Sequence, residues 1–213
     1  MENGEFHFPP PAASDLGDRE VPREGDLLAG AHVALLVTGG IAAFRTPGLA
    51  RALRKQGALV TAFATTEALR YVAREALEWA CDRPVVVDLT AAAEHLSDAV
   101  RFDAYLVAPA TYGVIGKCAH GIADTPVTAT LASAIGRMER GRSAVLFAPT
   151  MHGSMHTSIL VANLRSLHSL GCTVVPPRDA NGKHNLPDDG VLVDACAAAI
   201  RALRGTRRPA RPA

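Results

Sequence analysis

A glycine pair after an apolar run is the first feature of the sequence that suggests ligand binding. The stretch VTGGIAAF places Gly39 and Gly40 at this position. Because glycine has no Cβ, backbone N–H groups there can approach a phosphate at the start of a following helix. The spacing is neither G-x-G-x-x-G nor a Walker loop, which argues against a dinucleotide and against nucleoside triphosphate hydrolysis. A phosphate on a smaller cofactor and a plain strand-to-helix turn are both compatible with it.

Two further stretches carry small or hydroxylated residues at the end of an apolar run. Thr65 and Thr66 end one run and open a helical pattern, so a hydroxyl there can reach the same phosphate or simply cap the helix. The stretch YLVAPATYGVIGKCAHGIADTPVT, residues 105–128, starts as a buried strand, breaks at a proline and continues with small residues. Such a strand end presents backbone instead of bulky side chains to one spot.

The elements that must position these residues alternate between strand and helix patterns. Helical spacing is found at 44–57, 66–80, 123–138 and 153–171, the last ending at Gly171 as a C-cap. Short apolar runs rich in β-branched residues predict about six strands covered on both faces, at 32–38, 58–64, 84–89, 103–110, 143–150 and 172–177.

This alternation predicts an α/β fold with a doubly wound, Rossmann-like parallel sheet in a flavodoxin-like three-layer sandwich. In such sheets the ligand lies beyond the carboxyl ends of the strands, near the point where strand order reverses. We therefore expect the loops after the first, fourth and fifth predicted strands to converge.

Composition fits one folded domain with a segment at each end. The 213 residues are 48% hydrophobic and 20% charged, with a formal net charge of +1, which does not favour nucleic acid or an acidic membrane surface as partner. Residues 1–30, rich in proline and charge, predict a flexible leader. Residues 31–204 are expected to form the folded domain, and residues 205–213 a basic disordered tail.

The cysteines and the N-terminus bear on metals and location. The four cysteines form no Cys-x-x-Cys pair, a spacing that fits neither a zinc site nor a dense disulfide framework. We therefore expect reduced thiols and no metal. No basic segment precedes an apolar stretch at the N-terminus, and no apolar run reaches about 18 residues. A cytoplasmic protein that does not span a membrane is the expectation.

Five stretches, in order between about residues 32 and 177, resemble motifs of the homo-oligomeric flavin-containing cysteine decarboxylases, the family of phosphopantothenoylcysteine decarboxylase and of lantibiotic peptide decarboxylases. TGGIAAFR resembles the phosphate loop G-[SG]-I-A-A-[YF]-K, and TTEALRYV is similar to T-x-x-A-x-x-F. EHLSDAVRFDAYLVAPA resembles H-I-x-L followed by Asp and an apolar strand. PATYGVIGKCAHGIADTPVT resembles P-A-S-A-N-T with its G-I-A-D continuation, and PTMHGSMH resembles P-x-M-N-x-x-M-W.

The resemblance implies FMN as cofactor, since one phosphate loop is present and no place for an adenylate is visible. A flat isoalloxazine ring needs a strand end without bulky side chains, which would account for the small residues after residue 110. The last motif implies substrate binding by Met151, His152 and Met155. The positions that match the family's flavin contacts are Gly39, Gly40, Ile41, Thr65, Thr111, Tyr112, Gly113, Val114 and Thr150.

His95 matches the family's catalytic histidine through its spacing to Asp103 and the strand that follows. The implied role is a base that helps remove the thiol proton while a hydride leaves Cβ for flavin N5. The resulting thioaldehyde accepts the electron pair released with CO2, and the product is an enethiol. An imidazole can take up and return a proton near neutral pH, as this role requires.

Departures from the family motifs bear on the substrate. Gly113 stands where P-A-S-A-N-T has Asn, and His152 and His156 stand at the Asn and Trp of P-x-M-N-x-x-M-W. The Ala-Cys-Gly clamp of phosphopantothenoylcysteine decarboxylases, whose Cys helps reduce the enethiol, has no cysteine counterpart in PPRDANGKHNLPDD. Its loss implies that the enethiol is released and that another acceptor, such as oxygen, reoxidises the flavin. Residues 178–190 fit either a flexible lid over a peptide C-terminus or a surface loop.

The resemblance therefore implies an FMN-dependent cysteine decarboxylase, a carbon–carbon lyase. We expect it to act on the C-terminal cysteine of a ribosomally made precursor peptide (RiPP) and to assemble as a trimer or dodecamer. One alternative is phosphopantothenoylcysteine decarboxylase of coenzyme A biosynthesis. Another is a non-catalytic flavin-binding regulatory subunit. The match at His95 argues against a flavin prenyltransferase-like protein.

Overall fold

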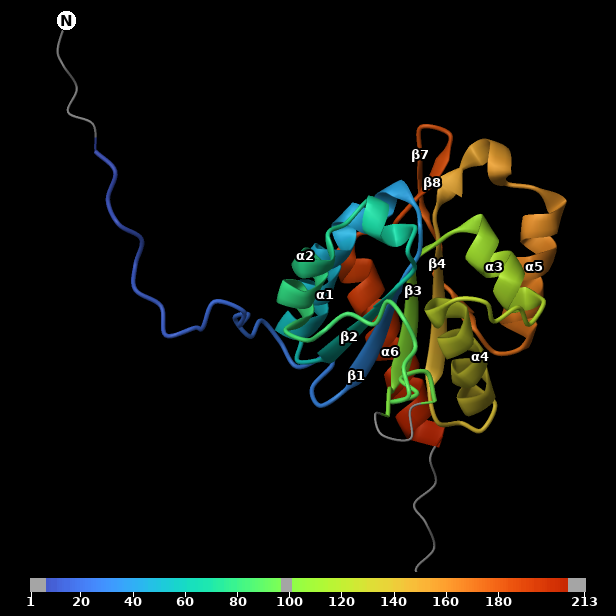
Figure 1. The fold of residues 1–213 in the computed structure, drawn as a ribbon, viewed down its shortest axis with the longest axis horizontal. Coiled ribbons are helices and arrows are strands. Elements are labelled where there is room, and N and C mark those ends of the chain that lie inside the picture. Colours follow the sequence, from blue (N-terminus) through green and yellow to red (C-terminus); the bar gives the residue numbers. More distant parts are fainter. Residues whose placement is uncertain (1–6, 97–100, 207–213) are drawn as a thin grey trace, which may run out of the picture.

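The fold is built around one parallel sheet, seen in a computed structural model that describes residues 7–96 and 101–206 (Figure 1). The strand order is β2-β1-β3-β4-β6, and every pairing is parallel. The order reverses between β1 and β3, which lie side by side although β2 separates them in the chain. The bounds are β1 His32–Val37, β2 Leu59–Ala64, β3 Ala104–Ala110, β4 Ala144–Pro149 and β6 Thr173–Val174.

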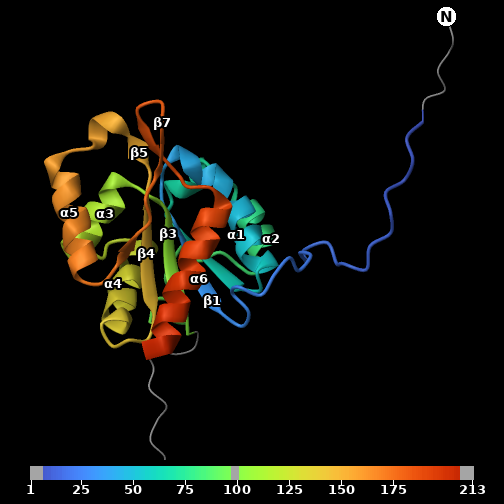
Figure 2. The same cartoon turned by 180° about the vertical axis from the view of Figure 1, so that it is seen from behind.

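Helices cover both faces of this sheet and make a three-layer sandwich, as the views from the two sides show (Figures 1 and 2). One face carries α1 (Thr46–Lys55), α2 (Arg74–Cys81) and α6 (Asp189–Thr206). The other carries α3 (Tyr112–Ala119), α4 (Pro126–Met138) and α5 (Ser158–Ser169). The predicted doubly wound α/β fold is therefore confirmed.

Strand β3 lies at the centre of the sheet and is buried along its whole length. Its side chains alternate between the two layers, with Leu106 in one apolar cluster and Tyr105 and Val107 in the other. Continuous apolar character is what a parallel strand covered on both faces requires. The alternation explains why this run carries no charged residue.

Short elements complete the connections. A second, three-stranded sheet has the order β5-β8-β7 and consists of β5 (Met151–His152), β7 (Arg178–Ala180) and β8 (Lys183–Asn185). Single turns of 3-10 helix, η1 (Ile41–Arg45), η2 (Ala68–Arg70) and η3 (Gly153–Met155), follow β1, β2 and β5. The β7–β8 hairpin occupies most of the stretch that we expected to be a lid or a surface loop.

Of the predicted strands, one does not form and another is shorter than expected. The run at 84–89 forms no strand, and Val86 alone makes a parallel bridge to Phe63 at the outer edge of β2. The run at 172–177 pairs only at 173–174. Prolines explain both results, because Pro84, Pro176 and Pro177 cannot donate to a ladder.

Two helices were not predicted. Helix α3 begins immediately after β3, in the stretch whose small residues suggested only a strand end. Helix α6 was not predicted because its alanine-rich sequence, DGVLVDACAAAIRALRGT, has a weak apolar periodicity. It packs lengthwise against the sheet, where Leu192, Cys196 and Ile200 are buried.

The part of the N-terminal segment nearest the domain contacts α1. The Glu24 amide donates to the Lys55 carbonyl at 2.9 Å, and Leu28 is buried in the core. Residues 7–18 extend away from the body (Figure 1). Residues 1–6 and 207–213, which belong to the predicted leader and tail, lie outside the described residues, so the division into leader, domain and tail stays a prediction. None of the helices that the structure describes is both long and apolar enough to cross a membrane.

The packing of β1 makes a testable prediction. Leu36 is fully buried, whereas Leu59 on the neighbouring strand is 50% exposed. Leu36→Ala should lower the free energy of unfolding by about 2–5 kcal/mol, because truncation leaves a cavity in a close-packed core. Leu59→Ala is the matched control and should cost far less. Urea unfolding followed by circular dichroism measures both, and equal losses would contradict this assignment of the core.

Candidate functional site

A buried hydroxyl joins the two strand ends at which the sheet order reverses. Thr38, directly after β1, is 2% exposed, and its Oγ1 donates to the Pro109 carbonyl at 2.6 Å. The same oxygen lies 3.0 Å from Oγ1 of Thr111, directly after β3. The glycine loop and the start of α3 are thereby held beside each other at the switch point, the usual ligand position in open α/β sheets.

A large cavity opens at this switch point, with a volume of about 770 Å³. Three loops that we expected to converge, after β1, β3 and β4, form much of its wall. Helix α3 begins at this wall, and its N-cap residue, Thr111, makes no side-chain capping bond to the first turn. The predicted residues that line the cavity are Gly39, Gly40, Ile41, Thr111, Tyr112, Gly113, Thr150, Met151, His152 and Met155.

A smaller cavity of about 150 Å³ adjoins the first and shares Gly39, Thr111 and Gly113 with it. Its wall is rich in hydroxyl groups and includes the remaining predicted contacts, Thr65 and Val114, together with Lys117. Three further hydroxyl residues line it that were not predicted from the sequence, Thr38, Thr125 and Thr128. Thr65 also caps η2, since its Oγ1 accepts from the Ala68 amide at 3.2 Å.

Glycine is required at the loop after β1 for close packing. A Cβ on Gly39 would collide with the Cβ of Glu67, and a Cβ on Gly40 would lie 3.1 Å from Cγ2 of Thr111. Gly113 differs, because a Cβ there would meet nothing within 4 Å. The first two glycines therefore keep the wall intact, whereas the third leaves open space toward the cavity that it lines.

The β7–β8 hairpin closes one side of the large cavity. Its turn residues, Asn181 and Gly182, both have positive φ, +54° and +66°. Asn-Gly is the dipeptide that two-residue hairpin turns prefer, so this signal was present in the sequence but was missed. The Gly182 carbonyl accepts from the Gly153 amide at 2.9 Å, which ties the turn to η3.

The lining of the large cavity is basic. It includes Arg45, Arg178 and Lys183, and none of the described residues that line it is Asp or Glu. Arg45 lies 3.3 Å from a carboxylate oxygen of Asp189, just outside the lining. Burial raises the pKa of Asp189, and the Arg45 guanidinium opposes part of that increase. An anionic ligand would therefore meet an environment without opposing carboxylates.

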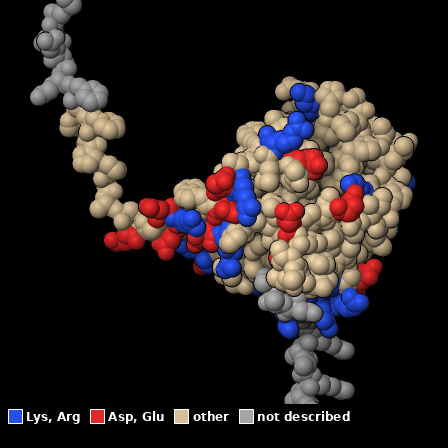
Figure 3. Space-filling view, viewed as in Figure 1, with Lys and Arg blue, Asp and Glu red and all other residues tan. Residues whose placement is uncertain are grey.

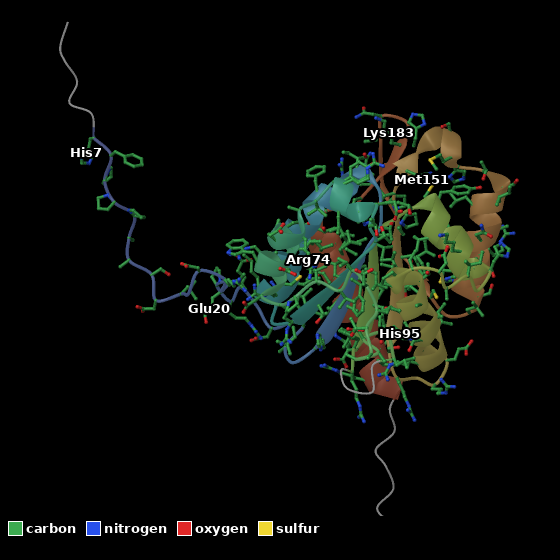
Figure 4. The ribbon with its side chains drawn as sticks, viewed as in Figure 1. His7, Glu20, Arg74, His95, Met151 and Lys183 are labelled. Carbon is green, nitrogen blue, oxygen red and sulfur yellow. The ribbon has the colours of Figure 1, made fainter. Side chains whose placement is uncertain are left out.

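His95 lies apart from the other predicted site residues. Figure 4 shows it near the amino ends of the strands, with Met151 and Lys183 at the opposite end. It lines a third cavity of about 540 Å³ together with Arg137 and Arg140 of the α4 region. Its Nδ1 is buried and has no hydrogen-bond partner among the residues that the structure describes. Within one chain, the structure does not bring this imidazole to the large cavity.

The cysteines lie away from the large cavity. None of the described lining residues is Cys. Burial raises the pKa of Cys81, Cys118 and Cys196 to about 12 and that of Cys172 to about 11. No group of three or more His, Cys, Asp or Glu among the described residues is arranged to hold a metal ion.

The fold and the paired cavities define a class of protein, doubly wound α/β proteins with a ligand site at the switch point. The chain belongs to the Flavoprotein family, whose sequence profile matches residues 23–201.

A curated relative is the coenzyme A biosynthesis bifunctional protein CoaBC of Thermococcus kodakarensis, 35% identical over 161 residues. The match covers 73% of this chain and 39% of that protein, so the chain spans about two fifths of the relative's length. The FMN-dependent cysteine decarboxylase SpaF superposes with a TM-score of 0.72 at 23% identity, covering 83% of this chain and 99% of that one. The cypemycin decarboxylase CypD gives 0.67 at 26% identity, with 85% and 98% covered.

The buried cysteines predict low thiol reactivity. A thiolate is the species that attacks disulfide reagents, and raised pKa values keep these groups protonated at neutral pH. Native protein should therefore react with Ellman's reagent far more slowly than denatured protein, which should release a signal for all four cysteines. A cysteine that reacts rapidly in the native state would contradict this description of the thiols.

Proposed function

We propose that this protein is an FMN-dependent oxidative decarboxylase that converts the C-terminal cysteine of a ribosomally made precursor peptide into an enethiol. The observation that carries the proposal is the pair of adjoining cavities at the β1–β3 switch point, one large and one small and rich in hydroxyls. Membership of the Flavoprotein family supports the cofactor class. The names of SpaF and CypD, both decarboxylases, support the reaction class.

The residues at the two cavities fit FMN. The hydroxyls of Thr65, Thr125 and Thr128 and the backbone around Gly39 suit a phosphate, because hydroxyl and N–H groups donate to its oxygens. Glu67 also lines the small cavity from an exposed position, and its carboxylate would oppose the phosphate. The large cavity offers space for a ring beside Thr111–Gly113, where bulky side chains are few. When bound, FMN supplies a hydride acceptor for the carbon beside the substrate sulfur.

The protein's own contribution to the proposed reaction is binding, orientation and proton transfer. Met151, His152 and Met155 line the large cavity and would contact the substrate. His95 would take the thiol proton and later return it to the enethiolate sulfur, so that no proton is gained or lost over the reaction.

The proposed role of His95 calls for a second copy of the chain. Because His95 and the large cavity lie at opposite ends of the sheet, we propose a trimer, or a dodecamer built from trimers, in which each cavity receives the histidine of a neighbour. Figure 3 shows few charged side chains on the side that carries α3 and α5, in contrast to the region of α1, α2 and the leader. Helix α5 carries exposed apolar side chains at both ends, Ile159, 61% exposed in its first turn, and Leu170, 44% exposed directly after its end. Charge-poor surfaces favour subunit contacts.

Two other functions are candidates besides a peptide decarboxylase. The CoaBC relative favours a decarboxylase of coenzyme A biosynthesis acting on phosphopantothenoylcysteine. The absence of cysteine from the described lining of the large cavity favours the peptide enzyme, because the enethiol would then leave without reduction. Gly113 and His152 leave a non-catalytic flavin-binding regulatory subunit as the third candidate.

An assay with purified protein tests the reaction. The preparation should be yellow, release FMN on denaturation, and convert peptides ending in Cys with a mass loss of CO2 plus two hydrogens. Loss of CO2 alone from phosphopantothenoylcysteine would favour the coenzyme A alternative. Gly113→Ala should fold normally, and any loss of FMN affinity in it reports contact with the cofactor. Colourless protein that takes up no added FMN would contradict the proposal.

Mixing two variants tests the origin of the histidine. His95→Asn should retain FMN and lose about 10²–10⁴-fold in turnover, since it removes the proton acceptor. Gly39→Ala should lose FMN through the collision with Glu67. Co-expression of the two should restore about a quarter of wild-type activity, because one site in four of a random ring pairs an intact cavity with an intact histidine. No recovery, with the hetero-oligomer confirmed by mass spectrometry, would show that His95 does not act across subunits.

A further inference from the structure

Three side chains at the rim of the large cavity form a hydrogen-bonded chain that the proposed reaction does not use. Nδ1 of His184, on β8, lies 2.6 Å from Oδ1 of Asp179, on β7. Nε2 of the same ring lies 2.8 Å from Nδ1 of His156, directly after η3. Both ring nitrogens of His184 are therefore engaged. The chain joins the hairpin to the segment after β5.

This arrangement fixes how many protons the two rings can share. An ionised Asp179 only accepts, so Nδ1 of His184 carries a proton. Nε2 of His184 then accepts from His156, or donates to it when His184 is charged. One added proton can thus sit on either ring while both hydrogen bonds persist. A second added proton would place two N–H groups face to face and break the hydrogen bond between the rings.

The chain lies where the large cavity meets an outer one of about 450 Å³. His184 and Lys183 line both cavities, whereas Asp179 and His156 line only the outer one. A positive charge on His184 is therefore next to the large cavity, whereas the Asp179 carboxylate that balances it lines the outer cavity. Figure 4 shows Lys183 near Met151 at this end of the sheet.

Other charged groups at the rim are already paired. Arg45 contacts Asp189 at 3.3 Å and Asp188 at 3.8 Å, and Arg178 contacts Asp188 at 3.7 Å. Lys183 makes no ion pair with any residue that the structure describes. The Lys183 ammonium is thus a cation on the cavity wall without a carboxylate partner among the described residues. The neighbouring ring of His184 can add another positive charge to the wall when it is protonated.

We infer that Lys183 and the chain Asp179–His184–His156 form an oxyanion-binding site at the cavity rim, with an affinity that depends on one shared proton. Lys183 supplies N–H donors to a carboxylate or phosphoryl oxygen. His184 acts through its charge, since both of its nitrogens are bonded. The inference rests on the proposed function only in assigning that oxyanion to the substrate.

Protonation of the chain should strengthen anion binding, so affinity should rise as pH falls. His152 is the other histidine among the described residues that line the large cavity, and its Nδ1 lies 2.8 Å from the Ser154 hydroxyl. The other charged groups at the rim are Arg45, Arg178, Lys183, Asp188 and Asp189, residue types whose ordinary pKa values lie outside the range of about 6 to 8. Any dependence of affinity on pH between about 6 and 8 therefore comes from histidine.

Calorimetric titration of the purified full-length protein with acetate and with sulfate tests the site without turnover. Both probes keep their charge between about pH 6 and pH 8, so a change in affinity must come from the protein. We expect binding about five times tighter at the lower pH, the effect of one nearby unit charge near a wet surface. Tighter binding of acetate than of sulfate would indicate that the substrate group is a carboxylate. Tighter binding of sulfate would indicate a phosphoryl group. Equal affinity at the two pH values, or no binding, would overturn the inference while leaving decarboxylation untouched.

Variants separate the parts of the site. His184→Asn keeps an amide donor for Asp179 but removes the titrating ring, so the pH dependence should disappear. Lys183→Gln should weaken binding about fivefold at both pH values. His168→Gln, at an exposed position of α5, is the matched control and should behave like wild type. His152→Asn should keep the pH dependence. If that variant loses the dependence and His184→Asn retains it, the chain is not the source.

Discussion

The bond that organises the site is the one from the Thr38 hydroxyl to the Pro109 carbonyl. The segments that follow β1 and β3 separate at the switch point, because these connections leave toward opposite faces of the sheet. Without a link between them, each loop could settle independently, and the cavity would have no fixed width. A buried threonine supplies that link at 2.6 Å and also contacts Thr111, the N-cap of α3. The glycines that follow it can then approach the neighbouring chain segments closely without closing the cavity.

Sequence patterns predicted the parts of the fold that local physics decides. Continuous apolar runs identified β1, β2, β3 and β4, because strands covered on both faces need apolar residues at every position. Gly39 and Gly40 could be placed at the site because the sequence shows directly which residues lack a side chain. Thr38 could not be found, since its role depends on a partner 71 residues away. Helix α3 was missed because its residues are small to leave space at a cavity, and small residues give a weak helical periodicity.

The position of His95 shows another limit of sequence reasoning. Spacing to Asp103 and β3 located the residue before a parallel strand, which already implies the amino end of the sheet, yet the family resemblance assigned it to a site beyond the carboxyl ends. In a parallel sheet, residues just before and just after a strand are separated by the strand's full length. A histidine before β3 and a cavity after it can therefore meet only between chains. The proposed reaction accordingly makes subunit assembly part of the site rather than an addition to it.

His152 illustrates how a substitution can preserve a chemical group. Its Nδ1 accepts from the Ser154 amide at 3.1 Å, so that nitrogen has no proton and the neutral ring carries its proton on Nε2. The imidazole then presents an N–H donor from the cavity wall, as the side-chain amide of Asn would in the motif P-x-M-N-x-x-M-W. The cap bond also fixes the ring's direction, because it belongs to the first turn of η3. A donor with a fixed direction is what a substrate carboxylate requires, and this argues that the change at residue 152 alters the shape of the site more than its hydrogen-bonding chemistry.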